Sequence, residues 1–317
     1  MPSTDDGKDH PSAHSLAPVV LCAGIAVEDY LFKVESFPAP GTKIRAVDLV
    51  ATTGGCAANA AVAVARLGGR ARFSGPVGSD DASRRFLDAL AKTGVDPSGV
   101  LRVEGGSISV SGIFIDSAGE KMVATLHGRG LDHAIPPDPA ALVADIDILL
   151  VDNRFPDFVL PICRAAAARG IPVVIDVDKA TRAGDPLFAT ATHVIFSSEA
   201  LLATTAISRI EAALMTIAGG IRAFLAVTNG PDDVLWIDGG AVRRLPVFAV
   251  EAVDTLGAGD SFHGGFALAL AEGRDEIAAM RFGAAAAALK CTRFGGISGT
   301  PQRREVDAFL AGNSDLK

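Results

Sequence analysis

The sequence lacks several signals that would assign it to a particular class. Its four cysteines are widely separated and show no C-x-x-C spacing, which favours reduced thiols in a cytoplasmic protein. No apolar run reaches membrane-spanning length, and no Gly-x-x-x-x-Gly-Lys-Ser/Thr string is present, which excludes a P-loop. Positive charge is also scarce, and a net charge of -8 argues against nonspecific nucleic-acid binding. We therefore expect neither a nucleic acid nor a membrane as partner.

The length and composition of the chain suit one large globular domain. The 317 residues are 49% hydrophobic, which is enough to bury a sizeable core. Residues 1–18 are polar and lack the apolar core of a signal peptide, so we predict a disordered tail there. From Val19 onward a nearly continuous apolar run predicts a strand buried on both faces. The folded domain is predicted to span residues 19–312.

From residue 141 onward, helix-like and strand-like segments alternate. Strands are predicted at 146–151, 172–177, 193–196 and 223–227, which favours an α/β fold with a doubly wound, mainly parallel sheet flanked by helices. Ligands of such sheets bind at the carboxyl ends of the strands. Polar groups follow these strands at Asp152-Asn153-Arg154, Asp176-Val177-Asp178, Ser197-Ser198-Glu199 and Thr228-Asn229-Gly230.

Two segments have a different pattern, with short alternating runs at about residues 30–50 and 107–127. This pattern is typical of brief strands that lie outside a main sheet. If the two segments pair, they form a small β lid over a site on the larger domain. A lid excludes water from a reaction that water would otherwise compete for.

A glycine-containing stretch at residues 253–263 is the strongest functional signal. We predict a strand at 247–253 before it and a helix at 264–271 after it, so its glycines lie at the junction. The backbone amides of residues 257–259 would then point outward at the positive end of the helix dipole, where a phosphate or a developing anion binds.

Asp260 ends this Gly-Ala-Gly-Asp string, and a carboxylate in an anion site repels the ligand. Its presence suggests a chemical task, namely to accept a proton from a hydroxyl that attacks a bound phosphoryl group. The string on its own is also compatible with a plain turn and an N-capping Asp. A dinucleotide fingerprint fits less well, because Phe262 stands where a third glycine is needed.

A second glycine pair, Gly54-Gly55, precedes an Ala/Val-rich helix, and Asn59 falls in the first turn of that helix. Alone, these residues indicate a hinge and an ordinary helix start. Together with the longer string Asp-Thr-x-Gly-Ala-Gly-Asp at 254–260, however, they resemble the two signatures of the ribokinase, or PfkB-type, carbohydrate kinases. The resemblance spans residues 19 to about 310.

This resemblance implies a ribokinase-like fold with a β lid, and ATP-dependent transfer of the γ-phosphoryl group to a primary sugar hydroxyl. Magnesium would accompany the nucleotide, and K⁺ would bind beside Asp254 and Leu256. The catalytic residues implied are Asp260 as base and Gly257, Ala258 and Gly259 as the anion hole. The sugar would meet Asp29, Gly54, Gly55 and Asn59.

The nucleotide site implied by the resemblance contains Thr228, Gly230, Thr255, Gly257, Gly259 and Ala284. The chain departs from the family pattern at one place. The Asn-x-x-Glu element of many members, which tunes the magnesium response, should fall at residues 197–200, where both key residues are absent.

Charge bears on the acceptor. Arg154 and Lys43 would face the sugar, and a guanidinium with an ammonium suits a sulfonate, carboxylate or phosphate. Residues 152–154, 196–197 and 288–296 resemble the sulfofructose kinase branch most, with Thr125 where that branch has an Asn. The expected acceptor is therefore a ketose-like sugar, with an anionic ketose such as 6-deoxy-6-sulfofructose as the example that these two cations would suit.

Several alternatives stay open. They are a kinase for a neutral sugar, for 2-keto-3-deoxygluconate or for a nucleoside, and a non-catalytic sugar-binding regulator. A nucleoside acceptor would need aromatic stacking, and the chain has one Trp and one Tyr. Because an open lid sheet has edges that can pair, we also expect a homodimer formed through the lid.

Overall fold

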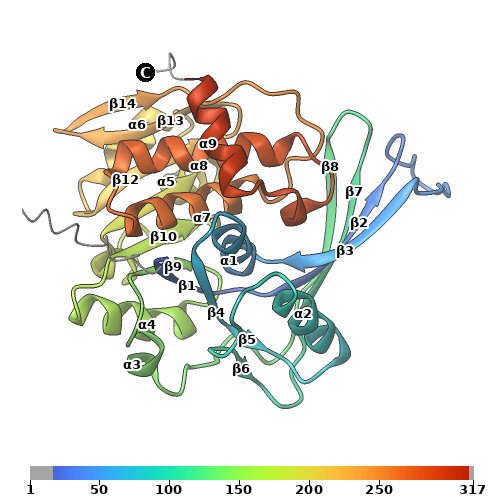
Figure 1. Ribbon diagram of the computed structural model, residues 1–317, viewed down its shortest axis with the longest axis horizontal. Helices are drawn as coiled ribbons and strands as arrows, with labels where there is room; N and C mark the ends of the chain where they lie inside the picture. The colour runs from blue at the N-terminus through green and yellow to red at the C-terminus, as the bar shows by residue number, and fades with distance from the viewer. Residues whose placement is uncertain (1–16, 314–317) are drawn as a thin grey trace, which may run out of the picture.

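The computed structural model describes residues 17–313, so the predicted tail lies outside the described residues except at its last two positions. Within this part of the chain the main sheet has the strand order β14-β13-β12-β11-β10-β9-β1-β4 (Figure 1). Six neighbouring strands of this sheet, β4, β1, β9, β10, β11 and β12, are parallel, and β13 and β14 form an antiparallel edge. Their bounds are β1 (Val19–Ala23), β4 (Arg70–Ser74), β9 (Ile148–Asp152), β10 (Val173–Val177), β11 (His193–Ser197), β12 (Phe224–Asn229), β13 (Asp232–Asp238) and β14 (Ala241–Leu245).

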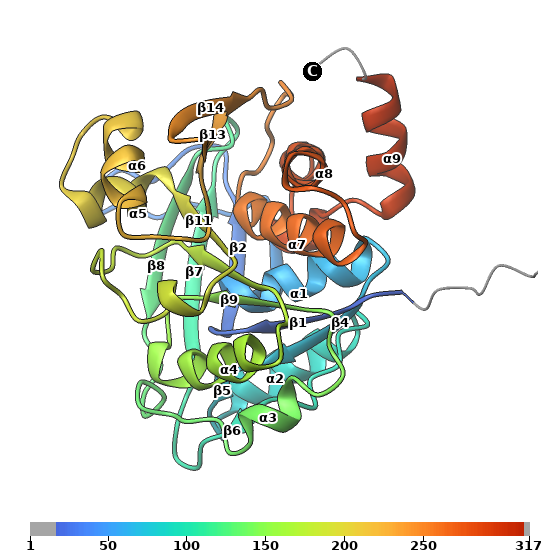
Figure 2. The ribbon, with the colours of Figure 1, turned by 90° about the vertical axis from the view of Figure 1, so that its left-hand side faces the viewer.

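Helices cover both faces of this sheet, which explains why β1, β9 and β10 are buried at every position. Figure 2 shows α5 and α6 on one side and α1, α7 and α8 on the other, with α9 outside α8. The predicted α/β class with a doubly wound sheet is confirmed. The bounds are α1 (Cys56–Arg66), α4 (Pro156–Ala168), α5 (Ser198–Thr205), α6 (Ile210–Ala218), α7 (Ala258–Ala271), α8 (Glu276–Cys291) and α9 (Arg303–Gly312).

The remaining elements are short or peripheral: β5 (Pro76–Val77), β6 (Leu101–Arg102), α2 (Asp81–Ala91), α3 (Pro139–Leu142) and the 3₁₀ turns η1 (Phe188–Thr190) and η2 (Gly296–Gly299). Among residues 17–313 we find no single helix with the length and apolar composition to cross a membrane; α5 and α6 meet that test only together, as a pair bent by 65°.

Small residues allow α1, α7 and α8 to pack closely. A Cβ on Gly264 in α7 would lie 2.6 Å from the carbonyl oxygen of Ala60 in α1, and one on Gly283 in α8 would lie 2.6 Å from that of Phe262. At such distances any side chain would push the helices apart. This close packing holds the first turns of α1 and α7 beside each other, and both turns carry predicted site residues.

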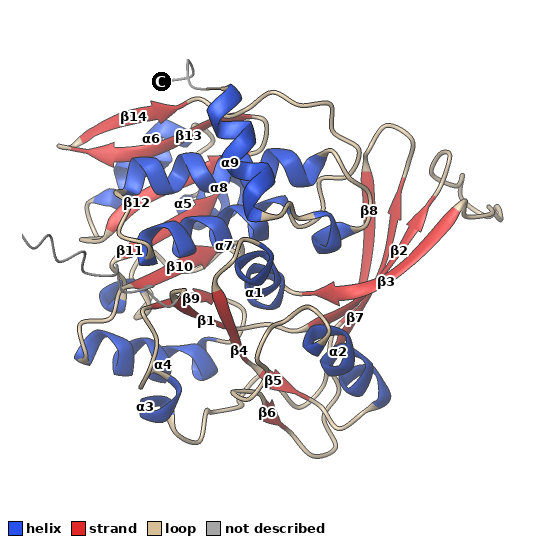
Figure 3. Ribbon diagram, in the orientation of Figure 1, coloured by secondary structure: helices blue, strands red, loops and turns tan. Residues whose placement is uncertain are grey.

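A second sheet lies beside the main one, with the order β3-β2-β7-β8, and Figure 3 shows it extending away from the helices. Its strands are β2 (Val27–Lys33), β3 (Asp48–Gly54), β7 (Ser109–Ile115) and β8 (Lys121–Leu126). The burial of β7 alternates from residue to residue, as expected for a sheet with one covered face. That face packs Leu31, Ile113 and Ile115 against Leu256 and Phe294, so this lid sheet contacts the glycine-containing stretch directly.

Two local expectations were wrong. No strand forms at 247–253; instead the amides of Val253 and Asp254 donate to the carbonyl oxygen of Cys291, at 2.7 and 3.1 Å, so the end of α8 takes the hydrogen bonds that a strand would need. The helix after the glycines begins at Ala258, not at residue 264. Asp29, a predicted sugar-site residue, lies inside β2, where only 6% of it is exposed.

Candidate active site

The candidate site lies at the point in the parallel sheet where the order in which the strands are added changes side. From β1 the chain continues to β4 on one side, whereas β9 leads to β10 on the other, and ligands of open α/β sheets bind at such switch points. Asp152 ends β9, and its Oδ2 accepts hydrogen bonds from the amides of Ile25 (2.8 Å) and Ala57 (3.0 Å). A Cβ at Gly24 would lie 2.2 Å from this carboxylate. One buried carboxylate therefore fixes the end of β1, the end of β9 and the start of α1.

Asp260 and Asn59 meet between the two helix N-termini. The Nδ2 of Asn59 in α1 donates to Oδ2 of Asp260 in α7 at 2.7 Å. Atoms of Cys56, Asp176 and Asp260 lie within 4.8 Å of one another. Burial, together with the carboxylates of Asp178 and other neighbours, raises the pKa of Asp260 to about 7 against the Asn59 hydrogen bond, which lowers it. A carboxylate with this pKa can both take up and release a proton at neutral pH.

His263 supports the same helix turn from behind. Its Nδ1 lies 2.9 Å from the carbonyl oxygen of Gly259 and 3.4 Å from Oδ2 of Asp176. Burial lowers the pKa of His263 to about 4, so the imidazole is neutral at pH 7 and Nδ1–H donates to Gly259. Burial also raises the pKa of Asp176 well above its usual range, with Asp178 as the next cause.

Arg154, one of the two predicted anion-binding cations, is already paired. Its Nε lies 2.9 and 3.0 Å from the two carboxylate oxygens of Asp178, and a second guanidinium nitrogen contacts Oδ2. The Cys56 thiol donates to the same carboxylate at 3.2 Å. Because the Arg154 side chain still exposes 34% of its surface, the pair lies at the rim of the site and keeps a solvent-facing edge.

The lid contributes Asp29 from β2. Burial raises the pKa of Asp29 to about 6, against a hydrogen bond from Ser111 that lowers it. A Cβ on Gly54 would lie 2.1 Å from Oδ2 of Asp29, so a glycine is needed there to make room for the carboxylate. Thr125 in β8 is exposed, and its hydroxyl lies 3.1 Å from that of Ser111. Thr125 is thus linked to Asp29 through one serine.

The other two predicted sugar-site residues differ in position: Gly55 lies at the start of α1, and Lys43 lies in an exposed connection. Gly55 is the N-cap of α1 with φ 93°, and a Cβ there would lie 2.4 Å from the carbonyl oxygen of Ile25. It therefore joins the lid to α1 where no larger residue fits. Lys43 is exposed in the connection between β2 and β3.

The predicted anion hole is partly engaged within the protein. Gly257 is the N-cap of α7 with φ 79°, a conformation that favours glycine. The Ala258 amide donates to the carbonyl oxygen of Thr255 at 3.2 Å, so it is turned into the chain. Gly259 is exposed, and no atom lies within 4 Å of where its Cβ would be. The open approach to the helix N-terminus is therefore above Gly259.

The predicted nucleotide residues lie on three elements. Thr228 is the last but one residue of β12, and its hydroxyl lies 3.4 Å from the carbonyl oxygen of Phe196. Gly230 lies in the tight turn to β13 with φ 58°. Ala284 lies in the middle of α8 and is 5% exposed. At the position of the missing Asn-x-x-Glu element, the Ser197 hydroxyl caps α5 by accepting from the Ala200 amide.

A second buried carboxylate, Asp254, lies just before the glycines. Its Oδ1 accepts from the Leu256 amide at 2.8 Å, and Oδ2 accepts from Gly295 and Gly296 at 3.0 and 2.8 Å. The ammonium of Lys290 lies 3.1 Å from Oδ2 and donates to the Asp254 carbonyl oxygen at 2.6 Å. The residues expected to bind K⁺ therefore already hold a cation, and K⁺ does not fit beside it.

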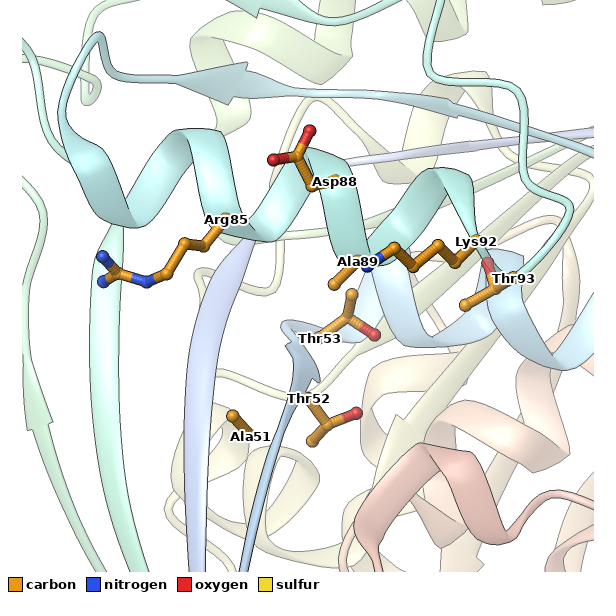
Figure 4. A pocket seen from close by; sticks show the side chains of 8 residues that line it. All are labelled: Ala51, Thr52, Thr53, Arg85, Asp88, Ala89, Lys92 and Thr93. Atoms are coloured by element: carbon orange, nitrogen blue, oxygen red, sulfur yellow. The ribbon is translucent and has the colours of Figure 1, made fainter.

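A cavity of about 460 Å³ lies elsewhere, between β3 and α2 (Figure 4). In Figure 4, Thr52 and Thr53 line it from the strand, and Arg85, Asp88 and Lys92 project from the helix. None of the site aspartates, Asp29, Asp152, Asp176, Asp178 and Asp260, lines this cavity. We therefore place the candidate site at the strand ends and not in this cavity.

Comparison with known proteins agrees with this geometry. The model of the pfkB family of carbohydrate kinases matches residues 18–303. The chain belongs to this family. It is an ATP-dependent sugar or nucleoside kinase, a phosphotransferase with an alcohol group as acceptor, and kinases of this family use ATP, typically with Mg²⁺.

Relatives of this pfkB-family kinase cover almost its whole length. Ribokinase of Haemophilus influenzae is 29% identical over 89% of the chain and 95% of the relative, and the ATP-dependent ribose-1-phosphate kinase of Halopiger xanaduensis is 31% identical over 93% and 99%. The crystal structure of an Agrobacterium tumefaciens protein has a TM-score of 0.91 at 37% identity, covering 95% and 100% of the two chains. Arabidopsis thaliana ribokinase, complexed with ribose and ATP, has a TM-score of 0.78 at 25% identity, covering 93% and 98%.

Sequence reasoning assigned no role to Cys56, His263 or Lys290. Cys56 was considered only as one of four scattered reduced thiols, yet it donates to Asp178. A signal existed for Lys290, since it is a single charge at the end of the run Gly-Ala-Ala-Ala-Ala-Ala-Leu in a helix. A lysine in a buried helix needs a partner of opposite charge.

Proposed function

We propose that this kinase transfers the γ-phosphoryl group of ATP to a primary hydroxyl of a sugar, with Asp260 as the general base. The supporting observation is the position of the Asp260 carboxylate at the start of α7, beside the open Gly259 and with a pKa of about 7. The acceptor oxygen bonds to the γ-phosphorus, the bond to the β-phosphate oxygen breaks, and the hydroxyl proton passes to Asp260. ADP leaves with the displaced oxygen.

For the acceptor, the charge of the site favours a neutral sugar. The Asp260 carboxylate lies within electrostatic reach of the carboxylates of Asp178, Asp29 and Asp152. The cation Arg154 is already paired with Asp178. Carboxylates and the Asn59 amide are suited to sugar hydroxyls, which donate and accept hydrogen bonds. A pentose or ketose fits this set, in line with the ribokinase of Haemophilus influenzae among the relatives.

An acidic ketose such as 6-deoxy-6-sulfofructose is the second candidate, and the exposed edge of Arg154 is the observation that favours it. Its sulfonate would have to share the guanidinium with Asp178, assisted by Lys43 and Thr125 from the lid segments. Arg154→Ala should then impair an acidic acceptor at least about tenfold more than a neutral one. Equal losses on both would rule out this candidate.

The nucleotide would lie against Thr228, Gly230, Thr255 and Ala284, with its γ-phosphate at Gly257 and Gly259. Mg²⁺ would neutralise phosphate charge and would be held mainly by the phosphates and water. The missing Asn-x-x-Glu element leaves Glu199, exposed in the first turn of α5, as the nearest carboxylate in the sequence there. K⁺ is not included, because Lys290 already lies at Asp254.

We further propose a homodimer through the lid sheet, in the cytoplasm. The edge strands β3 and β8 carry exposed apolar side chains, with Leu49 52%, Met122 46% and Leu126 68% exposed. A second copy of the chain would cover them. The four free cysteines suit a reducing compartment. Light scattering that gives the monomer mass at micromolar concentration would contradict the dimer.

The test of function is Mg²⁺-dependent ADP release with a panel of acceptors: ribose, fructose, tagatose, ribose 1-phosphate, 6-deoxy-6-sulfofructose, 2-keto-3-deoxygluconate and adenosine. Turnover on a neutral sugar supports the proposal, and turnover on adenosine alone would replace it with a nucleoside kinase. Tight sugar and ATP binding without turnover on any acceptor would favour the non-catalytic regulator.

A further inference from the structure

Lys290 is the most deeply buried charge among the described residues. It lies in the last turn of α8 with no exposed surface, and Asp254 beside it is 1% exposed. Its ammonium has two oxygen partners, the Asp254 carbonyl at 2.6 Å and the Asp254 carboxylate at 3.1 Å. Burying a charge is costly unless it is paired and hydrogen-bonded, so this position needs a positive charge.

The Asp254 carboxylate connects three segments. It accepts from Leu256, which precedes the glycines, and from Gly295 and Gly296, which precede η2. The amide of Asp254 itself donates to Cys291 at the end of α8. The Lys290 charge therefore stabilises the junction of the glycine stretch, α8 and the turn at residues 295–296.

This junction controls the proposed anion hole. Gly257, the N-cap of α7, follows Asp254 by three residues, and a Cβ on Gly257 would lie 3.4 Å from the Ile297 amide in η2. Leu256 also packs on Leu31 and Ile113 of the lid sheet. A shift of the Asp254 loop would thus move the amides that receive the phosphoryl group.

A carbonyl oxygen and a carboxylate oxygen are the ligands that hard cations prefer, and an ammonium supplies a single positive charge to the same oxygens. We propose that the Lys290 ammonium is a built-in replacement for a monovalent cation at Asp254. Lys290 is then a positioning residue for Gly257 to Gly259, and the protein needs no K⁺. The inference rests on the proposed function only where turnover is measured.

The first experiment uses the unmodified protein. ATP affinity by calorimetry, melting temperature and ADP release are compared in K⁺ and in choline at equal ionic strength. We expect each of the three quantities to be the same in K⁺ and in choline, with ATP affinity and turnover differing by less than about twofold. Stimulation by K⁺ of about fivefold or more in affinity or turnover would overturn the proposal. The affinity and melting arms need no acceptor, so they remain informative if every sugar fails.

The second experiment removes the charge with Lys290→Met, which keeps a long unbranched side chain. In choline we expect ATP affinity to fall about tenfold or more, and K⁺ or NH₄⁺ to restore at least half of the loss by filling the vacated place. The melting temperature of this variant alone should rise when K⁺ is added. Lys92→Met, which removes an exposed lysine just after α2, is the matched control and should not respond to K⁺.

Two results would contradict the replacement. One is normal ATP affinity of Lys290→Met in choline, and the other is a loss that no monovalent cation restores, which would make Lys290 a purely structural residue. If Lys290→Met does not fold, Lys290→Arg provides the second test, because a larger cation at Asp254 should retain K⁺ independence while shifting ATP affinity. K⁺ activation of Lys290→Arg would also overturn the proposal.

Discussion

Asp254 and Asp260 lie six positions apart in the chain, and their carboxylates are stabilised differently. The Asp254 carboxylate accepts hydrogen bonds from three backbone amides and lies beside the Lys290 ammonium, so both of its oxygens have partners within the protein. Asp260 belongs to the candidate-site cluster, defined as Asp29, Asp152, Asp176, Asp178 and Asp260, in which Arg154 pairs with Asp178. Burial raises the pKa of Asp29 and Asp152 to about 6 and that of Asp260 to about 7.

This difference indicates that Asp254 has a structural role, whereas Asp260 is suited to proton transfer. The hydrogen-bonding capacity of the Asp254 carboxylate is taken up by backbone amides and the Lys290 ammonium, which suits a residue that supports the loop. Burial raises the pKa of Asp260 to about 7, so this carboxylate can exchange a proton with a ligand near neutral pH. Asp260 follows Asp254 by six positions and lies beside the open approach above Gly259.

Asp260→Asn should give the largest effect. The amide keeps the shape and can still bond to Asn59, but it cannot accept the acceptor proton, so turnover should fall by about 10³-fold with ATP affinity nearly unchanged. Steady-state ADP release and ATP calorimetry measure the two quantities. Asp88→Asn, at an exposed position of α2, is the control. Near-normal turnover of Asp260→Asn would remove Asp260 as the base.

Asp254→Asn should instead reduce stability. It leaves the Lys290 ammonium buried without its counter-charge, and breaking one side of a buried pair costs about 3–5 kcal/mol. Denaturant unfolding measures the change. The double variant Asp254→Asn with Lys290→Met removes both charges and should recover at least half of the loss. Additive losses would show that the pair does not couple.

Gly54→Ala should disturb the cluster through sterics. Its Cβ would lie 2.1 Å from Oδ2 of Asp29, so the carboxylate must move away, and we expect the KM for the sugar to rise about 10- to 100-fold. Gly112→Ala in β7 of the same sheet is a matched control, since no atom lies within 4 Å of its Cβ. Equal KM values for the two variants would show that Asp29 does not contact the sugar.

The smallest effect is on pH-dependent stability. The folded-state pKa of Asp260 is raised above the unfolded value of 3.8, so its contribution is present below pH 3.8 and is lost as pH rises through about 7. Asp260→Asn lacks this loss and should be more stable than the unmodified protein at pH 8, by about 1–3 kcal/mol. The difference in stability between the two proteins should close toward pH 4.

Turnover of the unmodified protein should rise through pH 7, because the proposed base, Asp260, ionises there.

Local patterns determined much of this protein. The apolar runs predicted β1, β9, β10, β11 and β12 within a few residues, because strands covered on both faces have no polar alternation to obscure them. The string at 254–260 and the Gly54-Gly55 pair indicated the family, and the polar groups after the strands indicated the edge where the site lies. The edge strands β13 and β14 were missed, and the expected strand at 247–253 does not form.

The tertiary structure alone decided which charges act and which are neutralised. Arg154 is a free cation in the sequence, but Asp178, 24 positions away, pairs with it in the fold. Lys290 lies 36 positions from Asp254, and no local pattern shows that its ammonium fills the place expected for K⁺. Partners this far apart meet only through the packing of α7, α8 and the strands, and that burial also sets the pKa of Asp260 near neutrality.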